Sequence, residues 1–365
     1  MDLVITRTLT RRSLVSHASD TMGHRRTAPL VIGHRGAAGY RPEHTLASYE
    51  LAARLNAEFI EPDLVSTKDG ELVARHEPEI SHTTDVAQHS NFTDRKTTKV
   101  IDDKQVSGWF VEDFTVAELK TLRAVERMPR VRQHNTLYNH RCQIPTFGEI
   151  IALRKRLSTE LSREIGIYPE AKHPSYFRSI NLPLEPKLVD ALSKVGPNEP
   201  AAPVFVQSFE VSTLQALHAQ LQTPMIQLIN STGAPADFVA AGDKRTYSDL
   251  VTPAGLAGIA RYAAGIGPAK DRIVPRDAAG FSQPSTPLIR DAHAAGLLVH
   301  PFTFRNENRF LPAEDRSSTD PNAYGNAFAE YQQFYALGVD GLFSDVVDTA
   351  IAARTEFLTR QRSAA

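Results

Sequence analysis

The sequence predicts an α/β fold, a (β/α)8 TIM barrel with a β-hairpin and a polar insertion after its second strand. Two patterns predict it: short apolar runs recur along the chain, and amphipathic segments separate most of them. The runs expected to form the eight strands are 30–34, 58–64, 166–171, 203–208, 225–229, 264–268, 297–303 and 339–344. Since a barrel of this kind needs about 250 residues, a chain of 365 residues carries surplus length in its loops.

The expected helices alternate with these strands, at 43–55, 115–124, 146–161, 186–195, 211–221, 254–264, 285–295 and 325–337. The largest surplus is 77–145, a polar stretch rich in His, Asp, Thr and Arg. We therefore expect one domain over 30–358 that contains this insertion. Residues 1–29 are polar, rich in arginine and poor in acids, which predicts a disordered N-terminal extension. Two alternatives would explain the same composition: a transit peptide, or a true start of translation at Met22.

A tight-turn signal follows the second strand. Lys68-Asp69-Gly70 stands between two β-prone runs in "LVSTKDGELVARH". The strand is therefore expected to overshoot the barrel, turn and come back. About as many residues run out from Asp63 as return to His76, so His76 should lie level with Asp63 above the barrel mouth.

Composition narrows the classes of partner. Hydrophobic residues make up 41% of the chain, charged residues 23%, and the net charge is −1. These values are typical of a globular protein, and nothing in them indicates a nucleic-acid partner or a membrane surface. No apolar run suits an integral membrane protein. Cys142 is the only cysteine, so no intramolecular disulfide can form. Oligomeric state stays open, and the lack of an apolar signal segment favours a cytoplasmic location for the chain as given.

Charged and imidazole side chains gather at the expected C-terminal ends of the first three strands, where barrels of this class hold their reactive groups. Alternation along a strand makes residues two positions apart point the same way. The residues are His34 and Arg35 on the first strand, Glu61 and Asp63 on the second, and Glu170 and Lys172 on the third. With His76, they predict one polar site at the barrel mouth.

Three carboxylates this close repel one another unless a cation lies between them. Oxygen ligands alone favour Ca²⁺ or Mg²⁺ over Zn²⁺, so we expect one such divalent cation. Together with Arg35 and Lys172 it would leave the site one net positive charge, which suits a monoanion such as a phosphodiester. His34 and His76, on opposite sides, would then act as general acid and general base.

Each of these residues also has a plain structural interpretation. Glu61 and Asp63 could be a solvated pair on an edge strand, Glu170 and Lys172 a simple ion pair. His34 could be a core histidine with its hydrogen bonds satisfied. The functional hypothesis depends on all of them falling at strand ends that converge.

Three motifs, "GHRGAAGYRPEHT", "EPDLVSTKDGELVARHE" and "IGIYPEAKHP", resemble the glycerophosphodiester phosphodiesterase family, and most closely its longer bacterial periplasmic type. The resemblance continues through "VQSF", "GIGP", "LVHPFTFR" and "GVDGLFSD" and covers roughly 30–350. It implies metal-dependent hydrolysis of glycerophosphodiesters to sn-glycerol 3-phosphate and an alcohol such as choline, ethanolamine or glycerol. It also implies a periplasmic or secreted location as the alternative to the cytoplasm.

Carried over by motif, the resemblance assigns a role to each site residue. The acid–base pair would be His34 and His76; the metal ligands Glu61, Asp63 and Glu170; the phosphate contacts Arg35 and Lys172; the glycerol contacts Phe302 and Arg305. Two departures bear on substrate choice. Glu77 stands where the family usually has Asp, and Phe302 lacks the polar group of the more usual Trp or Tyr. The order of the histidines, and water or the glycerol 2-hydroxyl as nucleophile, are left open.

Two other functions fit part of the pattern. A phospholipase D-like or phosphoinositide-cleaving barrel would share the histidines and carboxylates, but it would expose aromatic or basic residues at its mouth to meet a membrane. The insertion holds few aromatics, namely Phe92, Trp109, Phe110, Phe114 and Tyr138. A non-catalytic glycerophosphodiester-binding barrel would be expected to lack a histidine or a metal carboxylate, and none is lacking here.

Overall fold

A computed structural model describes residues 28–364. The predicted extension, 1–29, therefore lies almost wholly outside the described residues. Within them, the chain begins at β1 (Leu30–His34) and ends in helix α12 (Val347–Ala364), which runs past residue 358. No helix in this part of the chain has both the length and the apolar character that crossing a membrane requires.

The strands confirm the predicted fold class. Those of the barrel are β1, β2 (Phe59–Glu61), β3 (Asp63–Ser66), β7 (Gly166–Ile167), β8 (Glu170–Ala171), β9 (Val206–Ser208), β10 (Met225–Ile229), β11 (Gly265–Pro268), β12 (Leu298–Val299) and β13 (Gly341–Ser344). They pair in parallel in two sheets, β13-β1-β2-β7 and β12-β11-β10-β9-β8-β3. This is a TIM-barrel-like order, although the ladders do not close into one ring.

Two prolines account for the division into two sheets. Pro62 separates β2 from β3, and Pro169 lies between β7 and β8, so each predicted strand is present as two short pieces. Proline has no N–H to give to a ladder, which interrupts the strand. In the described residues β12 and β13 do not pair as a ladder. A bridge from Phe304 to Ser344 spans the gap, together with backbone hydrogen bonds such as that from the Phe343 N–H to the Pro301 carbonyl at 3.1 Å.

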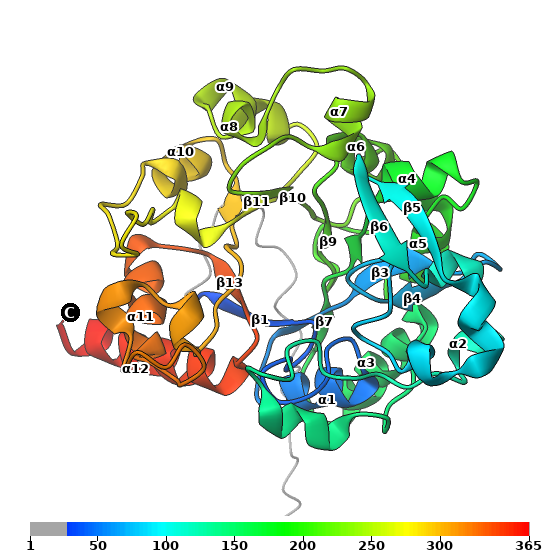
Figure 1. Ribbon diagram of the computed structural model, residues 1–365. Coiled ribbons are helices and arrows are strands. Elements are labelled where there is room, and N and C mark those ends of the chain that lie inside the picture. Colours follow the sequence, from blue (N-terminus) through cyan, green and yellow to red (C-terminus); the bar gives the residue numbers. More distant parts are fainter. Residues whose placement is uncertain (1–27, 365) are drawn as a thin grey trace, which may run out of the picture.

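Helices surround the strands (Figure 1). They are α1 (Leu46–Arg54), α3 (Phe147–Glu160), α4 (Pro174–Ser179), α5 (Glu185–Leu192), α6 (Val211–His218), α7 (Ala236–Ala240), α8 (Tyr247–Leu250), α9 (Pro253–Ile259), α10 (Leu288–Ala294), α11 (Ala327–Leu337) and α12. The helix expected at 115–124 is only α2 (Val116–Leu119), because the chain turns away soon after its Thr115–Glu118 capping box. Helices as short as α4, α7 and α8 span too few turns to show a periodic pattern, and the sequence did not predict them.

The barrel interior is a packed core, not a channel. Its buried residues are Leu30, Ile32, Phe59, Tyr168, Phe205, Ile226 and Phe343. The Tyr168 hydroxyl lies 3.0 Å from His300 Nδ1, so the polar end of the largest of these side chains is hydrogen-bonded. Alternate strand positions therefore fill the barrel, and the ends of the strands are left to build the site.

The hairpin after the second strand is confirmed. Strand β4 (Leu72–Ala74) pairs antiparallel with β3, and Gly70 in the turn has φ +77°. The Arg75 N–H donates to the Asp63 carbonyl at 3.0 Å. His76 therefore returns one residue beyond the level predicted for it.

The polar insertion has structure of its own. A second hairpin, β5 (Thr97–Ile101) and β6 (Lys104–Gly108), stands apart from the barrel strands (Figure 1). Its mostly polar strands carry too weak an alternation to have been predicted. Four of the insertion's aromatics are buried, namely Phe92, Trp109, Phe110 and Phe114, and Phe92 packs edge-to-face against Phe114. Since the Trp109 indole donates to the Phe92 carbonyl at 2.6 Å, these rings form no exposed apolar rim.

Candidate active site

A cavity of about 480 Å³ opens at the C-terminal ends of the barrel strands. Most of the predicted site residues line it, namely His34, Arg35, Glu61, His76, Glu170, Phe302 and Arg305. The other two predicted residues, Asp63 and Lys172, are buried directly behind the residues that line the cavity. Asp63 Oδ2 lies 3.5 Å from Arg35 Nε, and Lys172 Nζ lies 2.9 Å from Glu170 Oε1. The structure thus brings the whole predicted set together.

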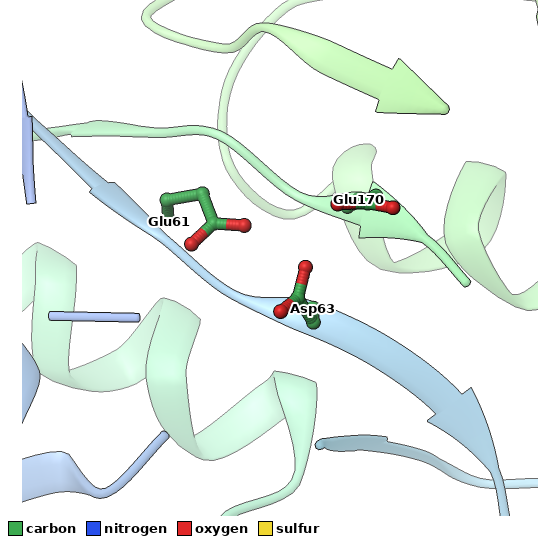
Figure 2. Close-up of side chains that lie close together, drawn as sticks. All are labelled: Glu61, Asp63 and Glu170. Carbon is green, nitrogen blue, oxygen red and sulfur yellow. The ribbon is translucent and has the colours of Figure 1, made fainter. Parts of the chain in front are cut away.

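The three carboxylates come from three strands, β2, β3 and β8. Glu61 ends β2, Asp63 begins β3, and Glu170 begins β8, where it is the parallel partner of Asp63. Figure 2 shows their side chains turned toward a common space. One oxygen from each lies within 4.8 Å of the others, and all three residues are buried.

Burial makes this cluster costly without a cation. It raises the pKa of Glu61 well above its ordinary value, and Asp63 and Glu170 add to the effect. Burial also raises the pKa of Glu170 to about 8, with Lys172 opposing it. Burial alone would raise the pKa of Asp63 too, but Lys172 and His44 hold it well below its usual range. Asp63 Oδ1 is buried and has no hydrogen-bond partner among the described residues, so it is available as a ligand.

Arg35 is aimed into the site by its backbone and by two acids. Its φ of +57° is left-handed, and its N–H donates to Glu61 Oε2 at 2.7 Å. Its Nη1 donates to Glu43 Oε2 at 2.8 Å. Glu43 was not predicted as a site residue, although the "RPEHT" motif contains it. His44, beside it, is also buried and lies 2.8 Å from Asp63 Oδ2 through Nε2. Both residues orient groups of the site from behind.

The turn after Arg35 depends on a glycine. Gly36 has φ +90°, and a Cβ there would lie 2.5 Å from the Ser48 carbonyl carbon. Replacing Gly36 by alanine is expected to lower the free energy of unfolding by about 2 kcal/mol or more, from backbone strain together with the clash. The measurement is urea denaturation followed by circular dichroism.

Gly233 is the matched control for this change. Its φ is +83°, but a Cβ there meets nothing within 4 Å. Gly233→Ala should therefore show only the backbone strain. Equal losses for the two variants would mean that the contact with Ser48 does not constrain the turn.

His34 is held by a carboxylate that the sequence did not reveal. Its Nδ1 lies 2.6 Å from Oδ1 of Asp345, the residue after β13. Burial, with a contribution from Arg35, lowers the pKa of His34 to about 4. With Nδ1–H donating to Asp345, Nε2 is the nitrogen left for proton transfer. The available signal was an aspartate at the end of the last strand, in "GVDGLFSD".

His76 has a similar arrangement. Its Nδ1 lies 2.5 Å from Glu77 Oε1, so the longer side chain at this position still reaches the imidazole. Burial, together with Arg35 and Lys172, lowers the pKa of His76 to about 3. Both candidate catalytic histidines are therefore neutral at pH 7 in the free site, and a carboxylate orients each of them.

The two predicted glycerol contacts, Phe302 and Arg305, both line the cavity, but Arg305 has a second partner. Phe302 lines the cavity and packs edge-to-face against Phe209, with ring centroids 5.9 Å apart. Arg305 lines it as well, but its Nε donates to Asp345 Oδ2 at 2.7 Å. Part of its donor capacity therefore serves Asp345. The Trp109 and Phe110 pair does not line the cavity, so the insertion covers no headgroup with these rings.

Further residues of the cavity wall follow the later strands β10 and β11 and lie outside the quoted motifs. They include Asn230, Ser231, Lys270, Asp271 and Arg276. Lys270 and Arg276 both donate to Glu330 Oε1, at 2.6 and 2.8 Å. Their charges are thus shared with an acid of helix α11.

A family model of known sequences matches the region that carries this site. It is the glycerophosphoryl diester phosphodiesterase family, and the match covers residues 34–349. The chain belongs to this family. It is 36% identical over 330 residues to glycerophosphodiester phosphodiesterase GDPD6 of Arabidopsis thaliana, covering 87% of this chain and 83% of the relative. It is 28% identical over 363 residues to a glycerophosphodiester phosphodiesterase of Haemophilus influenzae, covering 92% and 93%.

Solved structures agree on the fold. One from Silicibacter pomeroyi, assigned to the same enzyme class, aligns with a TM-score of 0.65 at 18% identity and covers 92% of this chain and 96% of its own. An Oleispira antarctica phosphodiesterase in complex with its product, sn-glycerol-3-phosphate, aligns with a TM-score of 0.57 at 21% identity, covering 89% and 96%. The resemblance read from the motifs, the fold class and the assignment to an enzyme are confirmed. Membership of this family also favours glycerophosphodiester hydrolysis over the two alternative functions.

Proposed function

We propose that the chain hydrolyses glycerophosphodiesters to sn-glycerol 3-phosphate and an alcohol, with one bound Ca²⁺ or Mg²⁺ and with His34 and His76 transferring protons. The observation that carries this proposal is the meeting, in one cavity, of a buried three-carboxylate cluster with two carboxylate-oriented histidines. The product proposed here is the one bound by the Oleispira antarctica relative.

Glu61, Asp63 and Glu170 would hold the cation. Their ligand atoms are all oxygens and lie close enough to share one ion, which suits Ca²⁺ or Mg²⁺. The buried oxygen of Asp63 that accepts no hydrogen bond supports the same assignment. When bound, a divalent cation supplies positive charge that polarises the phosphoryl group.

Arg35 and Lys172 would bind the phosphodiester anion. Arg35 lines the cavity, and Lys172 lies directly behind its wall, with Nζ 2.9 Å from Oε1 of the cavity-lining Glu170. Preorganised positive groups of this kind stabilise the charge that develops on the phosphoryl oxygens. We propose that both act on the nonbridging oxygens and fix the phosphorus for in-line attack.

The two histidines would divide the proton transfers. One accepts the proton of the nucleophile at Nε2, and the other protonates the departing alkoxide. Both are neutral in the free site because burial and neighbouring cations lower their pKa values. A bound phosphodiester brings a negative charge beside them, which raises the pKa of the histidine that must donate. The scheme holds for water and for the glycerol 2-hydroxyl as nucleophile.

The lining of the cavity favours an enzyme that discriminates little between substrates with different alcohol groups. An aromatic cage for choline needs several ring faces around the quaternary ammonium. The cavity-lining aromatic residues are Phe209, Phe302 and Phe343. Phe209 and Phe302 meet edge-to-face at 85°, and Lys172 Nζ already lies 5.6 Å from the Phe209 ring centroid. A cation in the substrate would compete with Lys172 for that ring.

We therefore expect glycerophosphocholine, glycerophosphoethanolamine and glycerophosphoglycerol to differ in kcat/KM by about tenfold or less, roughly 1.4 kcal/mol of transition-state binding. A short-chain phosphatidylcholine should be a poor substrate, because acyl chains would occupy the space of the free glycerol hydroxyls. Steady-state release of each alcohol is the measurement. A hundredfold preference for the choline ester, or faster turnover of the diacyl lipid, would contradict this view of the pocket.

A further inference from the structure

Arg127, in the polar insertion, contacts two acids of the site at once. It donates to both oxygens of Glu77, from Nη1 to Oε1 at 3.0 Å and from Nη2 to Oε2 at 2.5 Å. It also donates to both oxygens of Glu43, from Nε at 2.8 Å and from Nη2 at 2.6 Å. Glu77 is the carboxylate on His76, and Glu43 is the carboxylate on Arg35.

Arg132, five residues further along the insertion, does the same for the other histidine. Its Nη2 donates to Asp345 Oδ2 at 2.6 Å, and its Nε donates to Glu307 Oε1 at 2.8 Å. Its Nη1 donates to the Ala38 carbonyl at 2.9 Å. The side chain is only 5% exposed. Asp345 is the carboxylate on His34, so this arginine stands behind the second histidine.

The two arrangements are alike although their parts come from different segments. In each, an imidazole Nδ1 meets a carboxylate oxygen, and an arginine of the insertion holds that carboxylate. Charge-assisted bonds from a guanidinium to a carboxylate are strong and directional, so they fix the plane of the carboxylate. A fixed carboxylate in turn fixes the tautomer and the rotation of the imidazole it accepts from.

We propose that Arg127 and Arg132 are positioning residues, through which the insertion orients His76 and His34 for proton transfer. The inference rests on the proposed function, in which those histidines carry the proton transfers. It makes the insertion a part of the catalytic site, not only a covering structure.

The contacts predict different kinetic effects for the two arginines. Arg132 contacts neither Arg35 nor Lys172, although its acceptor Asp345 Oδ2 also accepts from Arg305, so its loss should lower kcat by about tenfold or more and change KM less than the loss of Arg127 does. Arg127 also holds Glu43, which orients Arg35, so its loss should lower kcat by a similar factor and raise KM as well. A purely structural role would not separate the two parameters in this way.

The test compares Arg127→Gln and Arg132→Gln with Arg141→Gln, in kcat and KM on glycerophosphocholine at saturating divalent cation. Arg141 is a matched control, because it belongs to the same insertion, is exposed, and donates to the Leu137 carbonyl. Lysine variants at 127 and 132 keep the charge and should recover part of kcat. They also keep the test informative if the buried Arg132→Gln protein does not fold, which circular dichroism will show.

Double variants identify the carboxylate through which each arginine acts. Arg132→Gln should lower kcat little when Asp345 is already Asn, but as much as in the wild-type protein when Glu77 is Gln. Arg127→Gln should lower kcat little in the Glu77→Gln protein and fully in the Asp345→Asn protein. Folded arginine variants with kcat equal to that of Arg141→Gln would overturn the inference, as would full effects in both backgrounds. An inactive wild-type enzyme would instead overturn the proposed function itself.

Discussion

Exhaustive removal of divalent cations is expected to abolish hydrolysis of glycerophosphocholine, a loss on the order of 10²-fold or more in kcat. Readdition of Ca²⁺ or Mg²⁺ should restore it. The physical reason is the cluster of Glu61, Asp63 and Glu170, whose oxygens are buried within 4.8 Å of one another. In the metal-free site, burial raises the pKa values of Glu61 and Glu170, so their charged forms are disfavoured until a cation is bound.

A second measurement tests cation binding without turnover. Ligands that bind only the folded state raise its stability with concentration, so Ca²⁺ should raise the Tm of the wild-type protein. Asp63→Asn removes a central carboxylate and should lose this shift. Asp190→Asn should keep it, because Asp190 lies on the exposed surface of α5, paired with Lys194. Full activity after EDTA treatment and dialysis, with no Tm response to either cation, would contradict the proposed cation site.

The parts of the site that the sequence predicted are those set by local pattern. His34, Glu61 and Glu170 stand at the ends of apolar runs, and a strand's direction is enough to place them at one mouth. The hairpin that returns His76 was also visible, because a three-residue turn signal marks it. Pro62 and Pro169, by contrast, interrupt two strands that were predicted as continuous runs.

The parts that the sequence did not predict depend on contacts between distant segments. Asp345 contacts His34, which is 311 positions away in the sequence, and Arg132 contacts Asp345, which is 213 positions away. No periodicity links such residues, and arginines in a polar insertion look like ordinary solvated charges. The second hairpin of the insertion escaped prediction for a related reason, since its exposed polar strands lack a clear apolar face.

His34→Ala and His76→Ala are each expected to lose on the order of 10²-fold or more in kcat, the usual contribution of a general acid or base. Each imidazole has a carboxylate on Nδ1, lines the cavity and is neutral in the free site. Each therefore has one ring nitrogen available to accept or donate a proton. The measurement is steady-state kinetics on glycerophosphocholine, with folding checked by circular dichroism.

Three other histidines are the controls for this change. His82, His89 and His134 belong to the insertion, and none of them lines the cavity. Replaced singly by alanine, they should stay near wild type in kcat. Near-normal kcat for a folded His34→Ala or His76→Ala protein would remove that histidine from the proposed proton transfers.

The same two variants can tell the acid from the base. A nitrophenyl ester of glycerol phosphate has a leaving group that departs without protonation, so it does not need a general acid. The variant that lacks the acid should recover much of its rate on this substrate, whereas the variant that lacks the base should remain slow on both substrates. Equal recovery by both variants would mean that neither histidine is dedicated to the leaving group, and the division of roles between His34 and His76 would then be wrong.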